Sequence, residues 1–188
     1  MINSKQDLNY YLCKDNCGWG SKSSLYRWIK RLGGSENYFS NDFFRILRHY
    51  EYHLNKKSNR LILRYWEFRY NHFRIRSNMF VAPNVFGPGV QIIHPGFLRA
   101  DAWVHIGSNC TVLPNVIFGK KKSMESSNST EIFVGNDCYI STGAIILGPV
   151  RIGNNVIVGA GALVNKDIPD NAVVAGVPAK IISTRYKE

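Results

Sequence analysis

A six-residue repeat is the feature of this sequence that most constrains its fold. Counting by six from Ile106, with one interruption, reaches a bulky apolar residue every time: Ile106, Val112, Phe118, Val134, Ile140, Ile146, Ile152, Val158 and Val164. The fourth residue after each is small or aliphatic wherever the repeat is uninterrupted. Such a period is typical of a solenoid in which each hexapeptide is a short strand plus a turn. Three hexapeptides make one triangular coil, with the repeated apolar side chains stacked inside and parallel ladders between coils.

The interruption lies between Phe118 and Val134, which are one hexapeptide plus ten residues apart. The intervening residues are polar and include the runs KKK and SSNST. We therefore expect an excursion loop over residues 119–133. Long loops on rigid scaffolds often carry function, although a basic surface loop without a role is the alternative interpretation.

The first 77 residues follow a different, helical pattern. Leu8, Tyr11 and Leu12 begin it, residues 25–32 resume it after two glycines, and residues 43–54 recur at helical spacing. A further helix is expected at about 59–73, with apolar residues spread so widely that it packs on more than one side. The sequence thus predicts a helical region over residues 1–77 and a β-helix domain with a C-terminal tail over residues 78–188.

Charge and composition narrow the partners. The chain has 24 lysines and arginines against 13 acidic residues, a net charge of +11, which favours anionic partners or membrane-surface proximity. Charge alone is a weak basis for nucleic-acid binding, which we do not expect. The sequence has no apolar run long enough to span a membrane and no signal pattern, and its four cysteines suit a reducing compartment. We expect a cytoplasmic protein.

The C-terminal run KDIPDNAVVAGVPAK (166–180) resembles the hexapeptide acyltransferase superfamily. Residues 86–181 are similar to serine O-acetyltransferases through the stretches 89–94, 106–110 and 143–148. The segments 2–12 and 84–89 look closer still to O-acetyltransferases encoded among surface-polysaccharide genes. This resemblance implies a left-handed parallel β-helix, a homotrimer with active sites between subunits, and acetyl-CoA bound along the C-terminal coils.

His94 aligns with the catalytic histidine of these enzymes, twelve residues before Ile106. A histidine can take the proton of an acceptor hydroxyl as that oxygen attacks the thioester, so we expect direct transfer with His94 as general base. Counting the repeat backwards puts His94 at an inward position. Either Pro95 and Gly96 shift the register there, or the histidine replaces a core residue.

The surroundings of this histidine depart from the serine enzymes. The aspartate that precedes their catalytic histidine is Ile93 here, and the place of their second histidine falls on Glu131. These losses argue against serine as acceptor and leave the partner that orients His94 open, with Glu131 and Asp101 as candidates. Each is also interpretable as an ordinary surface acid.

The resemblance also points to residues that bind coenzyme A, where small residues let a cofactor approach the backbone and lysines meet phosphates. These residues are Gly119, Gly143, Ala144, Gly159, Ala160, Gly161, Lys166 and Lys180. No metal is expected, because His49 and His53 have ligand spacing but lack companions. Cys110 and Cys138 occupy repeat positions that suit packing.

The sequence therefore predicts an acetyl-CoA-dependent O-acetyltransferase that acts on a sugar hydroxyl of a surface polysaccharide or its glycolipid precursor. Serine O-acetylation is the alternative within the same class. Two other classes share the prism: a carbonic-anhydrase-like lyase, which needs three zinc histidines where the repeat region has only His94 and His105, and a non-catalytic trimeric binding module.

Overall fold

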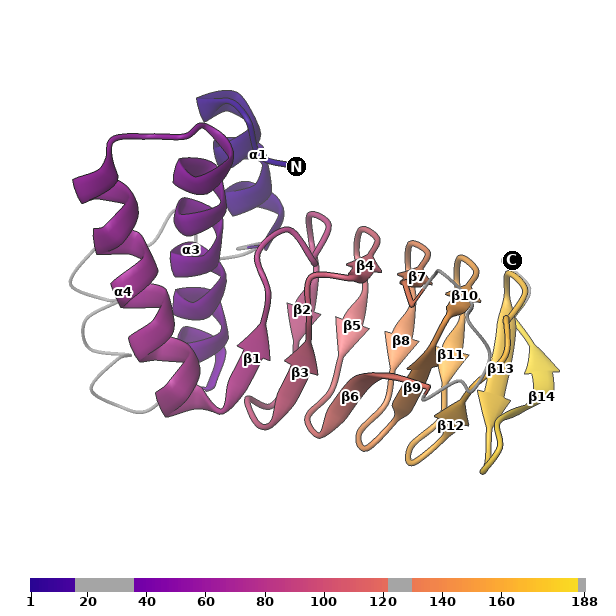
Figure 1. The fold of residues 1–188 in the computed structure, drawn as a ribbon. Coiled ribbons are helices and arrows are strands. Elements are labelled where there is room, and N and C mark those ends of the chain that lie inside the picture. The colour runs from indigo at the N-terminus through magenta and orange to yellow at the C-terminus, as the bar shows by residue number, and fades with distance from the viewer. Residues whose placement is uncertain (16–35, 122–129, 186–188) are drawn as a thin grey trace.

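The computed structural model describes residues 1–15, 36–121 and 130–185 and combines three helices with a parallel β-helix (Figure 1). Helix α1 covers Lys5–Asp15, α3 covers Glu36–Asn55 and α4 covers Arg60–Ser77. The two helices expected from residues 43–54 and 59–73 are therefore present. The helical stretch expected at residues 25–32 lies outside the described residues.

The β-helix has three sheets, and Figure 1 shows its coils stacked side by side away from the helices. Sheet A contains β1 (Met79–Val81), β3 (Leu98–Ala100), β6 (Val116–Lys120), β9 (Ile145–Gly148) and β12 (Leu163–Val164). Sheet B contains β4 (Val104–Ile106), β7 (Ile132–Val134) and β10 (Val150–Ile152). Sheet C contains β2 (Gln91–Ile92), β5 (Thr111–Val112), β8 (Tyr139–Ile140), β11 (Ile157–Val158), β13 (Ala172–Ala175) and β14 (Lys180–Thr184).

The register confirms the six-residue count. From β2 to β13 the chain visits the sheets in the order C, A, B, and paired strands run parallel, as in Ile140↔Val158 and Ile146↔Val164. These partners are three hexapeptides apart. Across the interruption Ile106 instead pairs with Val134, so the additional residues leave the coil between β6 and β7. The two strands take up both ends of the expected 119–133 excursion, and residues 122–129 lie outside the described residues.

All nine repeated apolar residues point into the prism and are at most 5% exposed. The residues four places later are also buried, and they adjoin the next strand rather than forming the bend. The bend comes one residue earlier, where the backbone has positive φ, as at Asn109 and Asn155. Glycine after the repeated residue has a steric reason: a Cβ on Gly135 would lie 2.6 Å from the carbonyl oxygen of Gly153 in the next coil.

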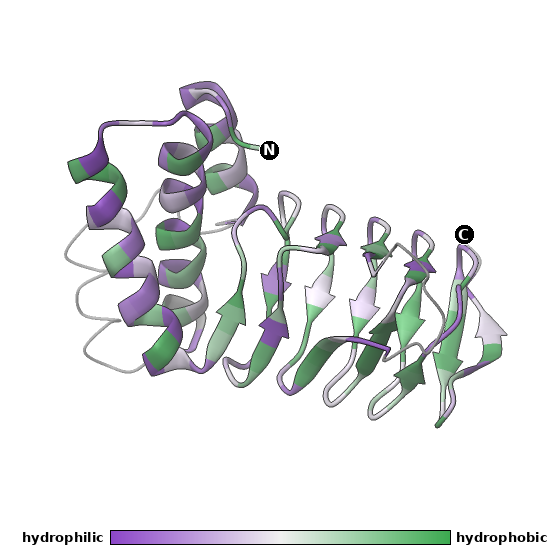
Figure 2. Cartoon of the chain, viewed as in Figure 1, coloured by the Kyte–Doolittle hydropathy of each residue, from purple (hydrophilic) through white to green (hydrophobic). Residues whose placement is uncertain are grey.

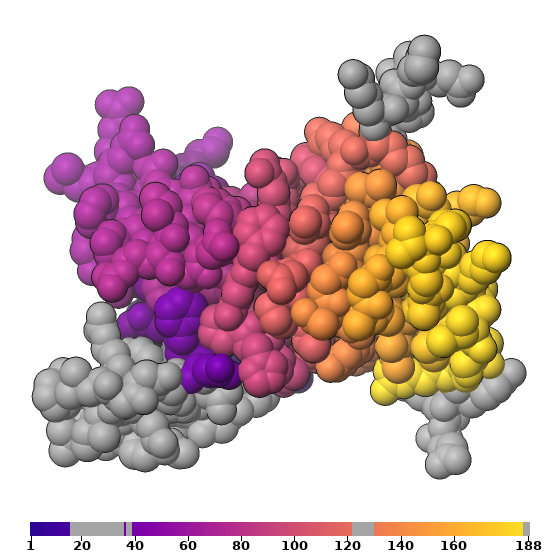
Figure 3. Space-filling view, turned by 90° about the horizontal axis from the view of Figure 1, so that it is seen from below, coloured from indigo at the N-terminus to yellow at the C-terminus, as the bar shows by residue number. Residues whose placement is uncertain are grey.

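The helices cap the N-terminal end of the prism, and Figure 2 shows the hydrophobic strand β1 beside them in green. Phe43, Phe44 and Leu47 of α3 are buried in the same core as the first coil. Helix α1 contacts α3, and α4 runs antiparallel to α3 on its other side (Figure 1). Seen from below, the helices and the C-terminal strands form opposite ends of one body (Figure 3).

A buried arginine ties the helices to the coil. The Arg48 side chain is fully buried; its Nε donates to Asp15 Oδ2 at 2.7 Å and its Nη1 donates to Glu51 Oε2 at 2.9 Å. The guanidinium also donates to the carbonyl oxygens of Phe86 and Gly87 at 2.8 and 2.7 Å. These bonds join α1, α3 and the first coil through one side chain.

Candidate active site

His94 follows β2 at the corner where the chain passes from sheet C to sheet A. The inward position of this coil belongs to Ile92, which is buried and pairs with Val112, so the inward placement of His94 expected from the count is wrong. Eight residues, instead of six, separate Ile92 from the equivalent inward residue Ala100. The two additional residues lengthen the corner, which is the register shift expected near Pro95 and Gly96, and turn the histidine outward.

The backbone of His94 is in the left-handed region, with φ of 58°. The other positive-φ residues of the β-helix from Asn84 to Gly176 are asparagine, aspartate or glycine, which tolerate this conformation. A histidine at this position makes the folded backbone less stable than an asparagine or glycine would. Residues held in sparsely populated conformations concentrate at functional sites, which supports a role for the His94 side chain.

Glu36 is the hydrogen-bond partner of this histidine, with 2.8 Å between its Oε2 and His94 Nδ1. Glu36 is the first residue of α3, where a carboxylate also interacts favourably with the helix dipole. The two side chains are 66% and 64% exposed. A carboxylate on Nδ1 selects the tautomer with hydrogen on that nitrogen, so Nε2 keeps its lone pair for a substrate proton.

A cavity of about 260 Å³ adjoins this pair and is bounded by α3 on one side and by β2 on the other. The buried hydroxyl of Ser40 donates to the carbonyl oxygen of Ile92 at 3.0 Å and so holds the two walls together. Phe44 and Val90 give the cavity an apolar floor, while Glu36 and His94 lie at its polar end. This is room for part of a small acceptor beside the candidate base.

The turns from sheet C to sheet A stack into one edge of the prism, which we call the C–A edge (residues 94–96, 113–115, 141–144 and 159–162). Gly96 lies directly over Pro114, since a Cβ on it would be 2.9 Å from Pro114 Cβ. Gly143 N donates to Pro114 O at 3.1 Å, and Gly161 N donates to Thr142 O at 3.0 Å. The C–A edge therefore carries His94 and, two and three coils further on, most of the glycines and alanines expected to bind coenzyme A.

The backbone of this edge is open at Gly161. Gly161 has φ of 65°, is exposed, and a Cβ built on it would meet nothing within 4 Å. Ala160 is also exposed, whereas Ala144 is fully buried. Successive coils are about 4.8 Å apart, so the turn at Gly161 lies about 14 Å along the edge from that of His94. An elongated ligand can lie on this path.

The other candidates gather along the opposite side of sheet A, which we call the A–B edge (residues 101–103, 119–121, 130–131 and 165–167). Asp101 there pairs with Arg99 at 3.3 Å, and Glu131 lies 3.9 Å from Nε2 of His105. Among the described residues neither acid has a hydrogen bond to His94, whose side-chain hydrogen-bond partner is Glu36. Gly119 and the exposed Lys166 also lie here, and Lys121 Nζ donates to the carbonyl oxygen of Asn165.

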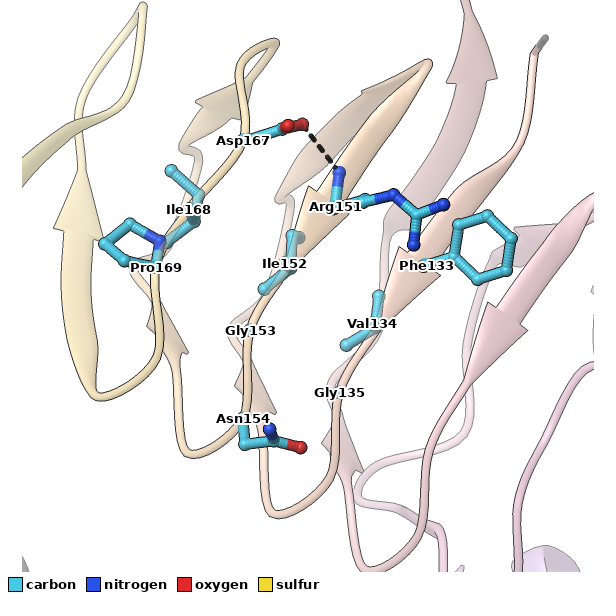
Figure 4. Close-up of a pocket in the computed structure, with 10 residues that line it drawn as sticks. All are labelled: Phe133, Val134, Gly135, Arg151, Ile152, Gly153, Asn154, Asp167, Ile168 and Pro169. Carbon is cyan, nitrogen blue, oxygen red and sulfur yellow. Dashed lines mark hydrogen bonds between the residues drawn. The ribbon is translucent and has the colours of Figure 1, made fainter.

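Lys180 stands apart from both groups, exposed at the start of β14 and paired with Ala175. Sheet B carries a hollow of about 480 Å³, drawn in Figure 4. Arg151 covers the ring of Phe133 there at 4.5 Å, and His105 stacks on the same ring at 4.9 Å. With both ring faces covered, Phe133 offers no stacking surface to a ligand.

Within the described ranges, no group of three or more histidine, cysteine or acidic side chains is arranged to hold a metal ion. Cys110 and Cys138 are free thiols buried between neighbouring coils, at positions that suit packing. No helix among the described residues is long and apolar enough to cross a bilayer.

Comparison with known proteins places this architecture in a class. A family model described as "Bacterial transferase hexapeptide (six repeats)" matches residues 131–166. Galactoside O-acetyltransferase of Escherichia coli (strain K12) is 38% identical over 90 residues, covering 44% of each protein. 2,3,4,5-Tetrahydropyridine-2,6-dicarboxylate N-acetyltransferase of Staphylococcus aureus (strain JH9) is 42% identical over 79 residues, covering 42% of this chain and 30% of that protein. The matched regions thus span less than half of either relative.

The fold itself matches over nearly the whole chain. Serine acetyltransferase from Brucella abortus strain S19 superposes with a TM-score of 0.72 at 19% identity, over 97% of this chain and 71% of that one. Its structure in complex with coenzyme A gives 0.73 over 98% of this chain and 71% of that one, also at 19% identity. The enzyme from Neisseria gonorrhoeae gives 0.70 at 22% identity, over 98% and 70%. The expected left-handed β-helix and the resemblance to hexapeptide-repeat acyltransferases are both confirmed.

Proposed function

We propose that this chain is an acetyl-CoA-dependent O-acetyltransferase in which His94 is the general base. The observation that carries the proposal is the outward His94–Glu36 pair at one end of an edge whose later turns expose bare backbone. The relatives matched by sequence are named acetyltransferases, and one structural neighbour holds coenzyme A, which supports the same class of reaction.

In the proposed reaction, His94 Nε2 takes the proton of the acceptor hydroxyl while that oxygen attacks the acetyl carbonyl carbon. The new C–O bond forms as the C–S bond breaks, and the imidazolium returns its proton to the departing thiolate. The Glu36 carboxylate holds the Nδ1 hydrogen throughout and stabilises the imidazolium between the two transfers, without taking the proton itself. No acyl-enzyme intermediate is required.

We further propose a homotrimer with the site between subunits. The candidate residues divide between the C–A edge and the A–B edge, and one prism cannot bring its own two edges together. His94 and Glu36 are also about two-thirds exposed in the single chain. A neighbouring subunit that places its A–B edge against this C–A edge excludes water from the pair and adds Glu131 or Lys166 to the site.

The coenzyme A path can be tested at Gly161. Asparagine tolerates the left-handed backbone, as Asn109 and Asn155 do at other corners, yet its side chain fills the open space beside Gly161. Gly161→Asn is therefore expected to raise KM for acetyl-CoA about tenfold or more with little change in the unfolding midpoint. An unchanged KM in a folded variant places the cofactor elsewhere.

For the acceptor, we propose a sugar hydroxyl of a surface polysaccharide or its precursor. The galactoside O-acetyltransferase relative supports a sugar, and the serine-enzyme positions that are Ile93 and Glu131 here supply no aspartate or histidine for an amino acid. The decisive assay measures release of free coenzyme A thiol from acetyl-CoA with glycans, nucleotide sugars or L-serine as acceptor. Turnover of serine without turnover of any glycan would establish serine O-acetylation instead.

Glu36 is a positioning residue in this scheme, and Glu36→Gln tests it. The amide oxygen still accepts from Nδ1, but it no longer stabilises the imidazolium. We expect kcat to fall about 10- to 100-fold while KM for acetyl-CoA stays within about threefold, because the base is no longer supported and the cofactor path is untouched. Asp42→Asn, on the same helix and paired with Arg45, is the matched control. A fall in kcat that is accompanied by an equal rise in KM and a lower unfolding midpoint would reduce Glu36 to a structural role.

A further inference from the structure

Helix α4 has two apolar faces, and the structure gives a partner to only one of them within the described residues. Its inner face packs on α3, where Phe73 and Tyr70 contact the rings of Phe43 and Tyr50 at 5.9 and 5.3 Å. The sequence expectation that this helix packs on more than one side therefore leaves an outer face to be explained.

The outer face carries an unbroken stripe, which we call the α4 stripe: Leu61, Tyr65, Phe68, His72 and Ile75. Their spacing of four, three, four and three residues places them on one line along the helix. Leu61, Phe68 and Ile75 are 79%, 71% and 67% exposed. Figure 1 shows α4 at the end of the molecule opposite the C-terminal strands.

Arginines border the stripe on both sides. At 100° per residue, Arg60 and Arg64 fall along one side, and Arg69 and Arg76 fall along the other. The single acid of the helix, Glu67, is paired with Arg64 at 2.7 Å. The imbalance extends beyond α4: residues 1–77 contain 15 lysines and arginines against six acids, whereas residues 78–188 contain nine against seven. The positive charge of the chain is thus concentrated in the half that bears the stripe.

We propose that the α4 stripe docks on the surface of an anionic lipid bilayer, with the helix lying in the interface plane. A line of apolar side chains flanked by arginines is typical of helices that bind such a surface. The rings and aliphatic groups insert at the boundary of the acyl chains, and the guanidinium groups contact the lipid phosphates. Attachment through a helix that lies in the interface plane is peripheral and reversible.

Charge selects the lipid surface over a second copy of this chain. In a self-association through the stripe, the arginine borders of one copy would face those of the other, and Glu67 is already engaged. An anionic surface instead gains from every one of these cations. The proposal does not depend on the acetyl-transfer reaction, although it would bring His94 near a lipid-linked acceptor.

The test is cosedimentation of the full chain with vesicles of phosphatidylcholine, with and without phosphatidylglycerol. We expect binding only when phosphatidylglycerol is present, and weaker binding as salt is raised, because salt screens surface charges. Leu61→Ser/Phe68→Ser is expected to reduce partitioning about tenfold or more, since two large apolar groups leave the interface. The matched control is Ile181→Ser/Ile182→Ser, which removes two exposed apolar side chains from β14 at the other end of the molecule.

Circular dichroism and acetyl transfer to a small water-soluble acceptor report whether each variant is folded, independently of binding. Equal binding to neutral vesicles, or equal loss in the β14 control, would contradict the proposal. A third outcome would also contradict it: the unaltered chain does not bind vesicles, and the Leu61→Ser/Phe68→Ser variant has half the particle mass in solution. The stripe would then be an interface between copies of the chain.

Discussion

Replacing His94 by asparagine is expected to abolish measurable acetyl transfer and leave the fold intact. A positioned general base contributes about 10²- to 10⁴-fold to rate, and asparagine cannot accept the hydroxyl proton. The left-handed backbone at this corner, with φ of 58°, suits asparagine better than histidine. The free energy of unfolding is therefore expected to hold or to rise by up to about 1 kcal/mol. Loss of kcat without loss of stability separates catalysis from folding.

The control is His105→Asn. His105 lies on sheet B, half exposed and stacked on Phe133, so its replacement is expected to leave kcat within about threefold of the unaltered chain. Activity and chemical unfolding are measured on the same preparations. If His94→Asn keeps its activity, the base is another group; if it unfolds, the corner depends on the ring itself.

The inward residues of the β-helix were predictable because the period alone determines them. Each hexapeptide adds one side of the prism, so Ile140, Ile146 and Ile152 fall inside without reference to anything remote in sequence. The steric need for glycine at position 135 comes from Gly153 in the next coil, yet it coincides with the sequence pattern of glycine after the repeated apolar residue. Local periodicity and tertiary packing agree throughout this part of the chain.

The same count failed at His94 because two residues had been added to one corner. An insertion that lies in a turn leaves both flanking strands intact, and the only signal in the sequence is Pro95-Gly96 breaking the alternation. Glu36 was out of reach altogether, since it lies 58 positions away and meets His94 only after α3 docks on the coil. Arg48 did have a signal in the sequence: it is a charged residue at helical spacing on the apolar face that carries Phe44 and Leu47.

The largest stability effect is expected at Arg48, because Arg48→Met leaves Asp15 and Glu51 buried without their counter-ion. Breaking a buried ion pair from one side typically costs about 3–5 kcal/mol, and the Phe86 and Gly87 carbonyl oxygens lose their donor as well. Asp15 Oδ1 and Glu51 Oε1 also accept backbone hydrogens from Gly89 and Asn84, each at 2.7 Å. The variant is therefore expected to loosen α1 and α3 from the first coil, and with them Glu36 from His94.

Two measurements separate the uncompensated charge from lost packing. The triple variant Arg48→Met/Asp15→Asn/Glu51→Gln keeps acceptors for both backbone hydrogens. It is expected to recover a substantial part of the lost free energy of unfolding, measured in urea.

Burial raises the pKa of the Asp15 and Glu51 carboxyl groups, and the Arg48 guanidinium opposes that rise. Without the arginine, the folded variant binds protons more readily than the unfolded chain. Its stability should therefore increase as pH falls from about 7 towards the unfolded carboxyl values near 4, and the triple variant should lack this dependence. A deficit that is the same at every pH, and is not relieved in the triple variant, would show that Arg48 acts through packing and its carbonyl contacts alone.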